Sequence, residues 1–361
     1  MQNDTNIQVK TLSQNQLKSL PDSKSLGFGQ YFSDHWFYSK YSNKDGWFES
    51  RVEPYGKITL DPGASVFHYG QALFEGMKAF KRHDGSIWLF RPGFNHARIV
   101  EGAERLCMKA PPKTLFMKAI KELLTVDSRW VPAEKNCALY LRPTLIGSEA
   151  FLGVRPSNEF LFYIILSPVG SYYAEGSNAV KIWVEEKAQR AAPGGLGAVK
   201  AGANYAASLQ TAYAAKQKGY AQVLWLDGDQ DGVEEVGTMN VFFAFKNEIV
   251  TPALNGSILA GGVRDSVIAL LKKWNLPVVE RRITMTEIQE RLAKNELTDA
   301  FGTGTAAVIS PIGELNFKGR ALKIQTGSDS LHSKLLAEMN GIQLGTRPDE
   351  LSWMVKLENL A

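Results

Sequence analysis

A single lysine lies within a stretch of small residues in this sequence. The segment APGGLGAVKAGANYAAS, residues 192–208, places Lys200 among glycine and alanine. Small neighbours let a ligand approach the backbone closely, which favours a reactive lysine. A nucleotide-binding P-loop needs Gly before its lysine and Ser or Thr after it, whereas Val199 and Ala201 stand there. The alternative interpretation is an ordinary solvated lysine on a flexible loop.

Phenolic, acidic and glycine-rich segments follow this lysine. Tyr205 lies close behind it, and Glu235 stands in EEVGTMN, where an acidic pair precedes a turn of small residues. The turns Gly261-Gly262-Val263 and Gly302-Thr303-Gly304-Thr305 offer backbone N–H groups, and the second adds hydroxyls. Each is also compatible with a plain tight turn. Their occurrence in one chain favours a phosphate site.

Two further segments combine aromatic and charged residues. Tyr140 and Arg142 alternate in LYLRP, so a strand would direct both to one face, with the guanidinium able to fork onto a carboxylate. A surface strand would show the same pair. Tyr69 and Phe74 lie in HYGQALFEGMKAF, a pattern typical either of core packing or of the apolar wall of a small-molecule pocket.

Regular elements must position these residues. Strands are predicted for the β-rich runs SIWLF, CALYLRP, EFLFYIILSP, VKIWVEE and QVLWL. We expect Asn95 to cap a helix that carries Arg98 in its first turn. A second helix should span 204–218 and stop at Gly219, and a third should open after the Gly-Gly turn of LAGGVRDSVIALLKKW. GTMNVFFAF and EIVTP predict a hairpin that turns at 246–247.

Composition narrows the class of protein. The 361 residues suffice for two domains, and 44% hydrophobic with 22% charged residues is typical of a well-packed soluble protein. The net charge is only +4 and the basic residues are scattered, which argues against a nucleic-acid partner. Cys107 and Cys137 form neither a disulfide framework nor a CxxC pair, which favours the cytoplasm. The absence of a signal-like or bilayer-length apolar run argues against secretion and membrane insertion.

Two segments mark the expected boundaries. Residues 1–26 are rich in Asn, Gln, Ser and Lys, which bury little apolar area, so we expect an extended arm. PVGSYYAEGS, residues 168–177, places Pro, Gly and Ser between two apolar runs and is the expected connection between domains.

Several segments together resemble one known family. HYGQALFEGMKAF, LFRPGFNHAR, LYLRPTLIGSEAFLGV, GAVKAGANYAASL, EEVGTMNVFF and FGTGTAAV are similar, in order and separation, to motifs of the branched-chain amino-acid aminotransferases. These are class IV aminotransferases, pyridoxal-phosphate enzymes of fold type IV. The resemblance runs from about Phe28 to the C-terminal region, which is nearly the whole chain.

The resemblance implies a cofactor site for pyridoxal 5'-phosphate. Lys200 would carry the cofactor as a Schiff base, and would later move a proton. Glu235 would pair with the pyridine nitrogen, Tyr205 would hydrogen-bond the phenolic oxygen, and Arg98 would bind the phosphate. The remaining cofactor-binding residues implied are Thr238, Gly262, Val263 and Thr305.

The resemblance also implies a substrate site. A pocket for an aliphatic side chain would be lined by Phe28, Tyr69, Phe74 and Tyr172, with Thr238 and the turn Thr305-Ala306 near the α-carboxylate. Tyr140 and Arg142 would meet the side-chain carboxylate of glutamate.

The fold implied is α/β (α+β), like that of D-amino-acid aminotransferase. It would have a small N-terminal domain at 1–168, a loop at 169–177, a large cofactor-binding domain at 178–361, and the cofactor between the domains. The reaction would be the reversible, ping-pong transamination of L-leucine, L-isoleucine and L-valine with 2-oxoglutarate. A homodimer with shared active sites and no metal is implied. This chain departs from the animal enzymes in reading AAVIS, without their redox CxxC.

Other functions stay open at this point. D-amino-acid aminotransferase and aminodeoxychorismate lyase share the fold and the lysine, although the predicted pocket residues favour the branched-chain enzymes. A phosphate-binding module without a covalent cofactor would explain the glycine-rich turns alone. A catalytically silent relative is the third alternative, and the presence of Lys200, Glu235, Tyr205 and Arg98 together argues against it.

Overall fold

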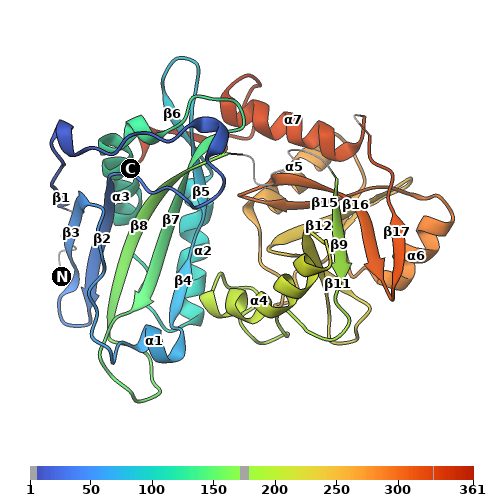
Figure 1. Cartoon of the computed structure of the whole chain (residues 1–361), viewed down its shortest axis with the longest axis horizontal. Helices are drawn as coiled ribbons and strands as arrows, with labels where there is room; N and C mark the ends of the chain where they lie inside the picture. Colours follow the sequence, from blue (N-terminus) through green and yellow to red (C-terminus); the bar gives the residue numbers. More distant parts are fainter. Residues whose placement is uncertain (1–5, 171–178, 328) are drawn as a thin grey trace. The chain divides into compact units, whose positions relative to one another are not determined.

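The computed structural model describes residues 6–170, 179–327 and 329–361 (Figure 1). The chain forms two compact units, each built on a β-sheet with helices. The first unit contains residues 1–174, 199–202 and 341–361, and the second contains 175–198 and 203–340. The mixed α/β fold class predicted from the sequence is confirmed.

The first unit is built on a sheet with the strand order β1-β3-β2-β8-β7-β5-β6-β18, in which β4 also pairs with β7. Its pairings are antiparallel except for that of β1 with β3. The strands are β1 (Gln8–Val9), β2 (His35–Ser42), β3 (Gly46–Pro54), β4 (Ala72–Phe74), β5 (Met77–Lys81), β6 (Ile87–Phe90), β7 (Ala138–Gly147), β8 (Glu159–Val169) and β18 (Met354–Lys356).

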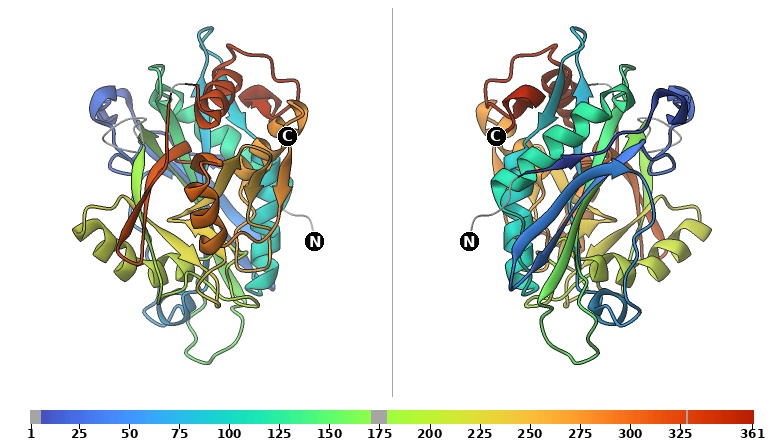
Figure 2. Two further views of the ribbon diagram at one scale, coloured as in Figure 1. Left: turned by 90° about the vertical axis from the view of Figure 1, so that its right-hand side faces the viewer. Right: turned by 90° about the vertical axis from the view of Figure 1, so that its left-hand side faces the viewer.

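Helices α2 (Pro92–Arg105) and α3 (Lys113–Val126) complete the core of this unit, after the short α1 (Ser65–Tyr69) (Figure 2). Ile99 of α2 and Phe116 of α3 are fully buried in one apolar cluster with side chains of the sheet. Such burial, at roughly 1.5–3 kcal/mol for each large apolar side chain, is what holds amphipathic helices to a sheet.

The predicted start of α2 was wrong. Asn95 does not cap the helix, because Pro92 occupies its first position, where a fixed φ and a missing N–H suit a helix start. Asn95 therefore lies inside the helix and Arg98 lies in its second turn. The Asn95 side chain is used for a tertiary contact instead, with Glu75.

The second unit is built on a sheet with the order β11-β10-β9-β16-β15-β12-β13-β14, in which β17 pairs with β16. Because β11 also pairs with β12, the strands from β11 to β12 close into a ring. The strands are β9 (Val180–Val184), β10 (Gln222–Leu226), β11 (Val233–Val236), β12 (Met239–Phe245), β13 (Ile249–Thr251), β14 (Val278–Glu280), β15 (Leu297–Gly304), β16 (Val308–Phe317) and β17 (Arg320–Lys323).

The helices of the second unit confirm two predictions. Helix α4 (Gly202–Gln217) begins two residues before the expected start, and Gly219 follows its end with a positive φ of 84°. Helix α5 (Gly262–Lys273) opens directly after the Gly-Gly turn. The predicted hairpin is the β12–β13 pair. The other helices are α6 (Met285–Ala293) and α7 (Leu331–Leu344).

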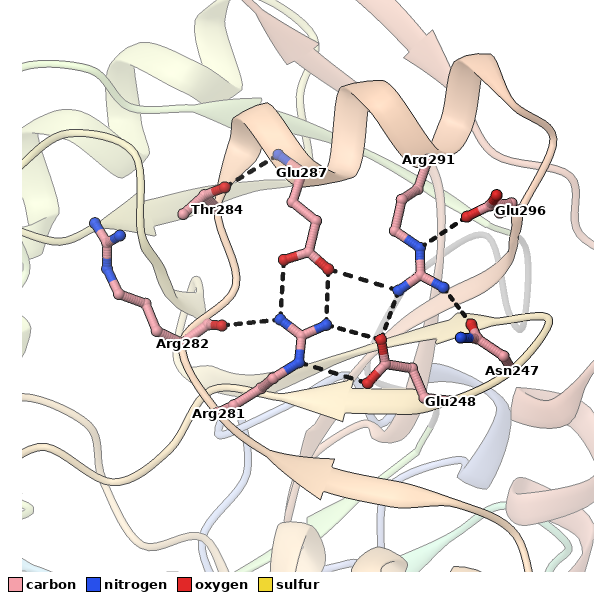
Figure 3. Close-up of polar contacts among 8 residues, drawn as sticks. All are labelled: Asn247, Glu248, Arg281, Arg282, Thr284, Glu287, Arg291 and Glu296. Carbon is pink, nitrogen blue, oxygen red and sulfur yellow. Dashed lines mark hydrogen bonds and ion pairs between the residues drawn. The ribbon is translucent and has the colours of Figure 1, made fainter.

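A network of ion pairs fastens the β12–β13 hairpin to the region of α6 (Figure 3). A nitrogen of Arg281 lies 2.9 Å from Glu248 and 2.7 Å from Glu287. Arg291 of α6 lies 2.7 Å from the same Glu248 and also donates to Asn247 at the hairpin turn. Thr284 caps α6 by accepting a hydrogen bond from the Glu287 N–H.

The unit boundaries differ from the expected 1–168 and 178–361 in two places. Residues 341–361 belong to the first unit, because β18 adds to its sheet beside β6. Residues 199–202 also belong to it, since Ala201 pairs with Leu73. Most of the expected connection, 169–177, lies outside the described residues. Within the described ranges, no helix is long and apolar enough to cross a membrane.

Candidate active site

Lys200 is fixed at the edge of the first sheet. It lies between the glycine-rich loop and α4, and its carbonyl oxygen accepts a 3.1 Å hydrogen bond from the Phe74 N–H. Ala201, the next residue, forms a β-bridge with Leu73. The loop therefore docks on β4 at the residue predicted to react.

The surroundings of the Lys200 ammonium favour its neutral form. Its Nζ atom lies 4.9 Å from the centre of the Phe74 ring, and the guanidinium of Arg142 lies 4.6 Å from the same ring. Burial, and then Arg98 and Arg142, lower the pKa of Lys200, while Tyr140 and Glu75 oppose this shift, and the resulting pKa is about 8. At neutral pH about a tenth of this lysine is therefore an unprotonated nucleophile, far more than of an ordinary solvated lysine with a pKa of 10.5.

Arg98 reaches the same region from α2. Its Nε atom donates to Glu75 at 2.6 Å, and one of its terminal nitrogens donates to the other Glu75 oxygen at 2.7 Å. Asn95 adds a 2.7 Å hydrogen bond to this carboxylate. Sequence reasoning did not select Glu75. The feature of the sequence that could have identified Glu75 is its position as an acidic residue within the apolar run ALFEGM.

Aromatic and basic residues predicted for substrate binding also lie near Lys200 in the first unit. Arg142 donates a 3.1 Å hydrogen bond to the Tyr140 hydroxyl, so the two side chains do share one face of β7. The ring of Phe28 packs edge-on to Tyr140 with centroids 5.0 Å apart. With Phe74 and Lys200, these side chains form one cluster in the first unit.

One predicted substrate residue, Tyr69, does not join this cluster. Tyr69 is in α1, 43% exposed, and its hydroxyl donates to the backbone carbonyl of Leu152. Tyr172 lies outside the described residues.

A second group of predicted residues lies in the second unit, around Glu235. This buried carboxylate accepts a 2.8 Å hydrogen bond from the Leu259 N–H, and Asn240 donates to it at 3.4 Å. Arg190 lies 3.1 Å from its other oxygen and is also buried. Arg190 was missed by sequence reasoning, where a basic residue before the glycine-rich loop was the only signal.

The turn before α5 lies beside Asn240, which donates to the Glu235 carboxylate. Asn240 also accounts for the glycine at position 261, because a Cβ there would lie 2.1 Å from the Asn240 amide oxygen. Gly262 and Val263 begin the helix, at the end where backbone N–H groups are directed toward an anion. Other residues predicted for the site lie near helix or strand ends in this unit: Tyr205 in α4, Thr238 between β11 and β12, and Thr305 and Ala306 between β15 and β16.

Fold and sequence place the chain in a known family. Residues 72–315 match the family model described as amino-transferase class IV, which covers more than half of the chain. The chain belongs to the class IV aminotransferases.

Particular relatives narrow the comparison. The chain is 47% identical, over 94% of its length and 96% of the other, to branched-chain-amino-acid transaminase 1 of Bacillus subtilis. Its fold is similar to a branched-chain aminotransferase of Thermoproteus uzoniensis solved with norvaline, with a TM-score of 0.73, 23% identity, and coverage of 89% and 99% of the two chains. It is also similar to the branched-chain amino acid aminotransferase of Thermobaculum terrenum, solved in its PLP form, with a TM-score of 0.71, 20% identity, and coverage of 90% and 98%.

Proposed function

We propose that this protein transfers the amino group of L-leucine, L-isoleucine and L-valine to 2-oxoglutarate, with pyridoxal 5'-phosphate as cofactor and Lys200 as the residue that binds it covalently. The observation that supports this most directly is the environment of Lys200, where burial lowers the pKa to about 8. The name of the Bacillus subtilis relative, which is 47% identical over nearly the whole chain, supports the substrate class.

The residues present fit this cofactor chemically. Its phosphate needs cationic and N–H donors, which Arg98 and the first turn of α5 offer. Its protonated ring nitrogen needs an anionic acceptor, which the buried Glu235 carboxylate offers. Pyridoxal phosphate, when bound, supplies an electron sink for removal of the Cα proton of an amino acid.

Lys200 has two tasks in this proposal. Its Nζ atom would hold the cofactor covalently, and a pKa of about 8 leaves enough unprotonated amine for this role. The same atom would accept the proton that leaves the substrate Cα, acting as the general base. The Phe74 ring lies beside Nζ, with its centroid 4.9 Å away.

The other residues bind and orient. Tyr205 donates to the cofactor phenolic oxygen, and Thr305 joins Gly262 and Val263 at the phosphate, as the resemblance implies. Thr238 and the turn Thr305-Ala306 meet the α-carboxylate. The aliphatic side chain contacts the aromatic walls formed by Phe28 and Phe74.

Arg142 is the residue that binds the second substrate, glutamate or 2-oxoglutarate. Its guanidinium, held by Tyr140 at 3.1 Å, forks onto the side-chain carboxylate of glutamate or 2-oxoglutarate. The same pair lies against the Phe28 and Phe74 rings, so an apolar side chain also finds contacts there. This combination suits a site that accepts both kinds of substrate.

The homodimer predicted from the resemblance is supported by exposed apolar side chains in the first unit. Phe67, Leu152 and Val154 are 61%, 65% and 86% exposed. Large exposed apolar groups are typical of protein interfaces. Light scattering should give the mass of a dimer for the wild type and a larger monomer fraction for Val154→Asp. The cytoplasmic location stays a prediction from the cysteine content.

The absorption spectrum of the purified protein tests the proposed function. A visible band from bound pyridoxal phosphate should be lost on adding L-leucine and unaffected by D-alanine. A response to D-alanine alone would favour a D-amino-acid aminotransferase. No band after incubation with pyridoxal phosphate would exclude the role proposed for Lys200, as would full activity of Lys200→Ala.

A further inference from the structure

Glu75 is a buried carboxylate to which no role was assigned above. It lies between β4 and β5 with 0% of its surface exposed. One oxygen accepts from Arg98 Nε at 2.6 Å, and the other accepts from Arg98 at 2.7 Å and from Asn95 at 2.7 Å. A buried charge persists only when it is paired and hydrogen-bonded, and here both oxygens are satisfied.

The same carboxylate also interacts electrostatically with Lys200. Phe74, its neighbour in the chain, is hydrogen-bonded to the Lys200 carbonyl, and the Glu75 N–H donates to Pro143 of β7 at 2.8 Å. Burial raises the pKa of Glu75, but Arg98 and then Lys200 lower it more, so that it lies below its usual range. Glu75 is therefore an anion between two cations.

We propose that Glu75 is the positioning residue of the active site: it orients Arg98 for the cofactor phosphate and provides the counter-charge of Lys200. This inference rests on the proposed function and adds a residue to it. A guanidinium whose Nε edge is fixed by a carboxylate is pre-organised, so less freedom is lost when its remaining donors meet an oxyanion.

The charged groups around Lys200 determine how removal of the Glu75 charge changes the pKa of this lysine. The ionisable groups that face this amine are Arg98 from α2, Tyr140 and Arg142 from β7, and Glu75. Glu75 is the carboxylate among them, so Glu75→Gln leaves the amine facing two guanidinium groups. The neutral amine is then favoured, and the lysine titrates at lower pH.

The first measurement compares two ligands of the apoenzyme, pyridoxal phosphate and pyridoxal. Titrations at about pH 9.5, where Lys200 is neutral in every variant, isolate the contribution of the phosphate. In Glu75→Gln, affinity for pyridoxal phosphate should fall about ten- to a hundredfold, while affinity for pyridoxal changes by less than about threefold. Glu101→Gln, an exposed carboxyl on α2, is the matched control and should equal the wild type.

The second measurement is the pH dependence of Lys200 acetylation in the apoenzyme, followed by peptide mass spectrometry. The wild-type midpoint should lie at about 8. Glu75→Gln should lower it by about one pH unit. General loosening of the structure would do the opposite, because an exposed Lys200 would titrate near its ordinary value of 10.5. The direction in which the midpoint shifts therefore distinguishes the proposed role of Glu75 from a merely structural one.

Glu75→Asp separates charge from geometry and serves if Glu75→Gln does not fold. The shorter carboxylate keeps the counter-charge, so the midpoint should stay close to that of the wild type. It cannot fork onto Arg98 in the same way, so affinity for the phosphate should still fall. For folded Glu75→Gln, an unchanged ligand ratio with an unchanged or raised midpoint would overturn the inference. For Glu75→Asp, an unchanged ligand ratio would do so. Failure of the wild type to bind pyridoxal phosphate would instead overturn the proposed function.

Discussion

The guanidinium of Arg190 and the carboxylate of Glu235 form a buried ion pair, with Nε 3.1 Å from Oε2. Arg190 is held in place by hydrogen bonds to the carbonyl oxygens of Gly197, at 3.1 Å, and of Ser257. It thereby connects the carboxylate proposed for the ring nitrogen with the loop that carries Lys200.

Replacement of Arg190 by Gln should weaken the cofactor site through Glu235. Loss of the cation favours the protonated carboxyl, which is a poor acceptor for a protonated ring nitrogen. We expect kcat to fall by about ten- to a hundredfold and the cofactor to be lost faster on dialysis. The dialysis is followed by the absorbance of retained cofactor. Wild-type retention and turnover in the folded variant would contradict this role, and Lys187→Gln, an exposed neighbour, is the control.

Gly76→Ala should affect the two substrates unequally. A Cβ atom at residue 76 would lie 1.9 Å from the Tyr140 hydroxyl oxygen, so the phenol and its partner Arg142 must move. Because this pair is proposed to bind the glutamate carboxylate, KM for glutamate should rise about tenfold and that for leucine by less. Steady-state kinetics with both amino acids measures this difference.

The control for that experiment is Gly93→Ala, where no atom lies within 4 Å of the added methyl group. Equal increases in both KM values for Gly76→Ala would argue against a glutamate-specific role of Tyr140 and Arg142.

Lys78→Met should change the pH dependence of stability. Burial lowers the pKa of Lys78 in the folded protein from 10.5 to about 8. Between these values the unfolded chain binds more protons at this residue, so its contribution to stability increases as the pH rises from 8 to 10.5. Over that range, the free energy of unfolding of the wild type should gain about 1–3 kcal/mol relative to Lys78→Met, as measured by urea titration. A difference that does not vary with pH would exclude this titration.

Glu287→Gln should loosen the attachment of α6. The carboxylate forms two hydrogen bonds with Arg281, at 2.7 and 2.9 Å, in a partly exposed network (Figure 3). Partly exposed pairs contribute modestly, so the free energy of unfolding should fall by about 0.5–1.5 kcal/mol. The loss should be smaller in high salt, where such charges are screened. Glu290→Gln, exposed on the same helix, should have no effect, and a matching loss there would show that the network contributes nothing specific.

Local patterns were sufficient to predict several of the strands and helices. The runs VKIWVEE and QVLWL became β9 and β10, and the Gly-Gly turn before α5 was correct, because apolar periodicity and turn residues act over a few neighbours. The predicted start of α2 was wrong for a local reason as well, because proline at the first position of a helix, here Pro92, is a stronger signal than Asn95.

The sequence by itself determined which residues have chemistry to offer: an isolated lysine among small residues, an alternating Tyr140 and Arg142, and glycines before a helix. Only the tertiary structure decided which charges meet. Glu75 and Arg98 are far enough apart in sequence to leave no periodic trace, as are Arg190 and Glu235, yet each pair is joined in the folded chain. Buried ion pairs are specified by packing between elements, and the same packing adds the C-terminal β18 to the first sheet.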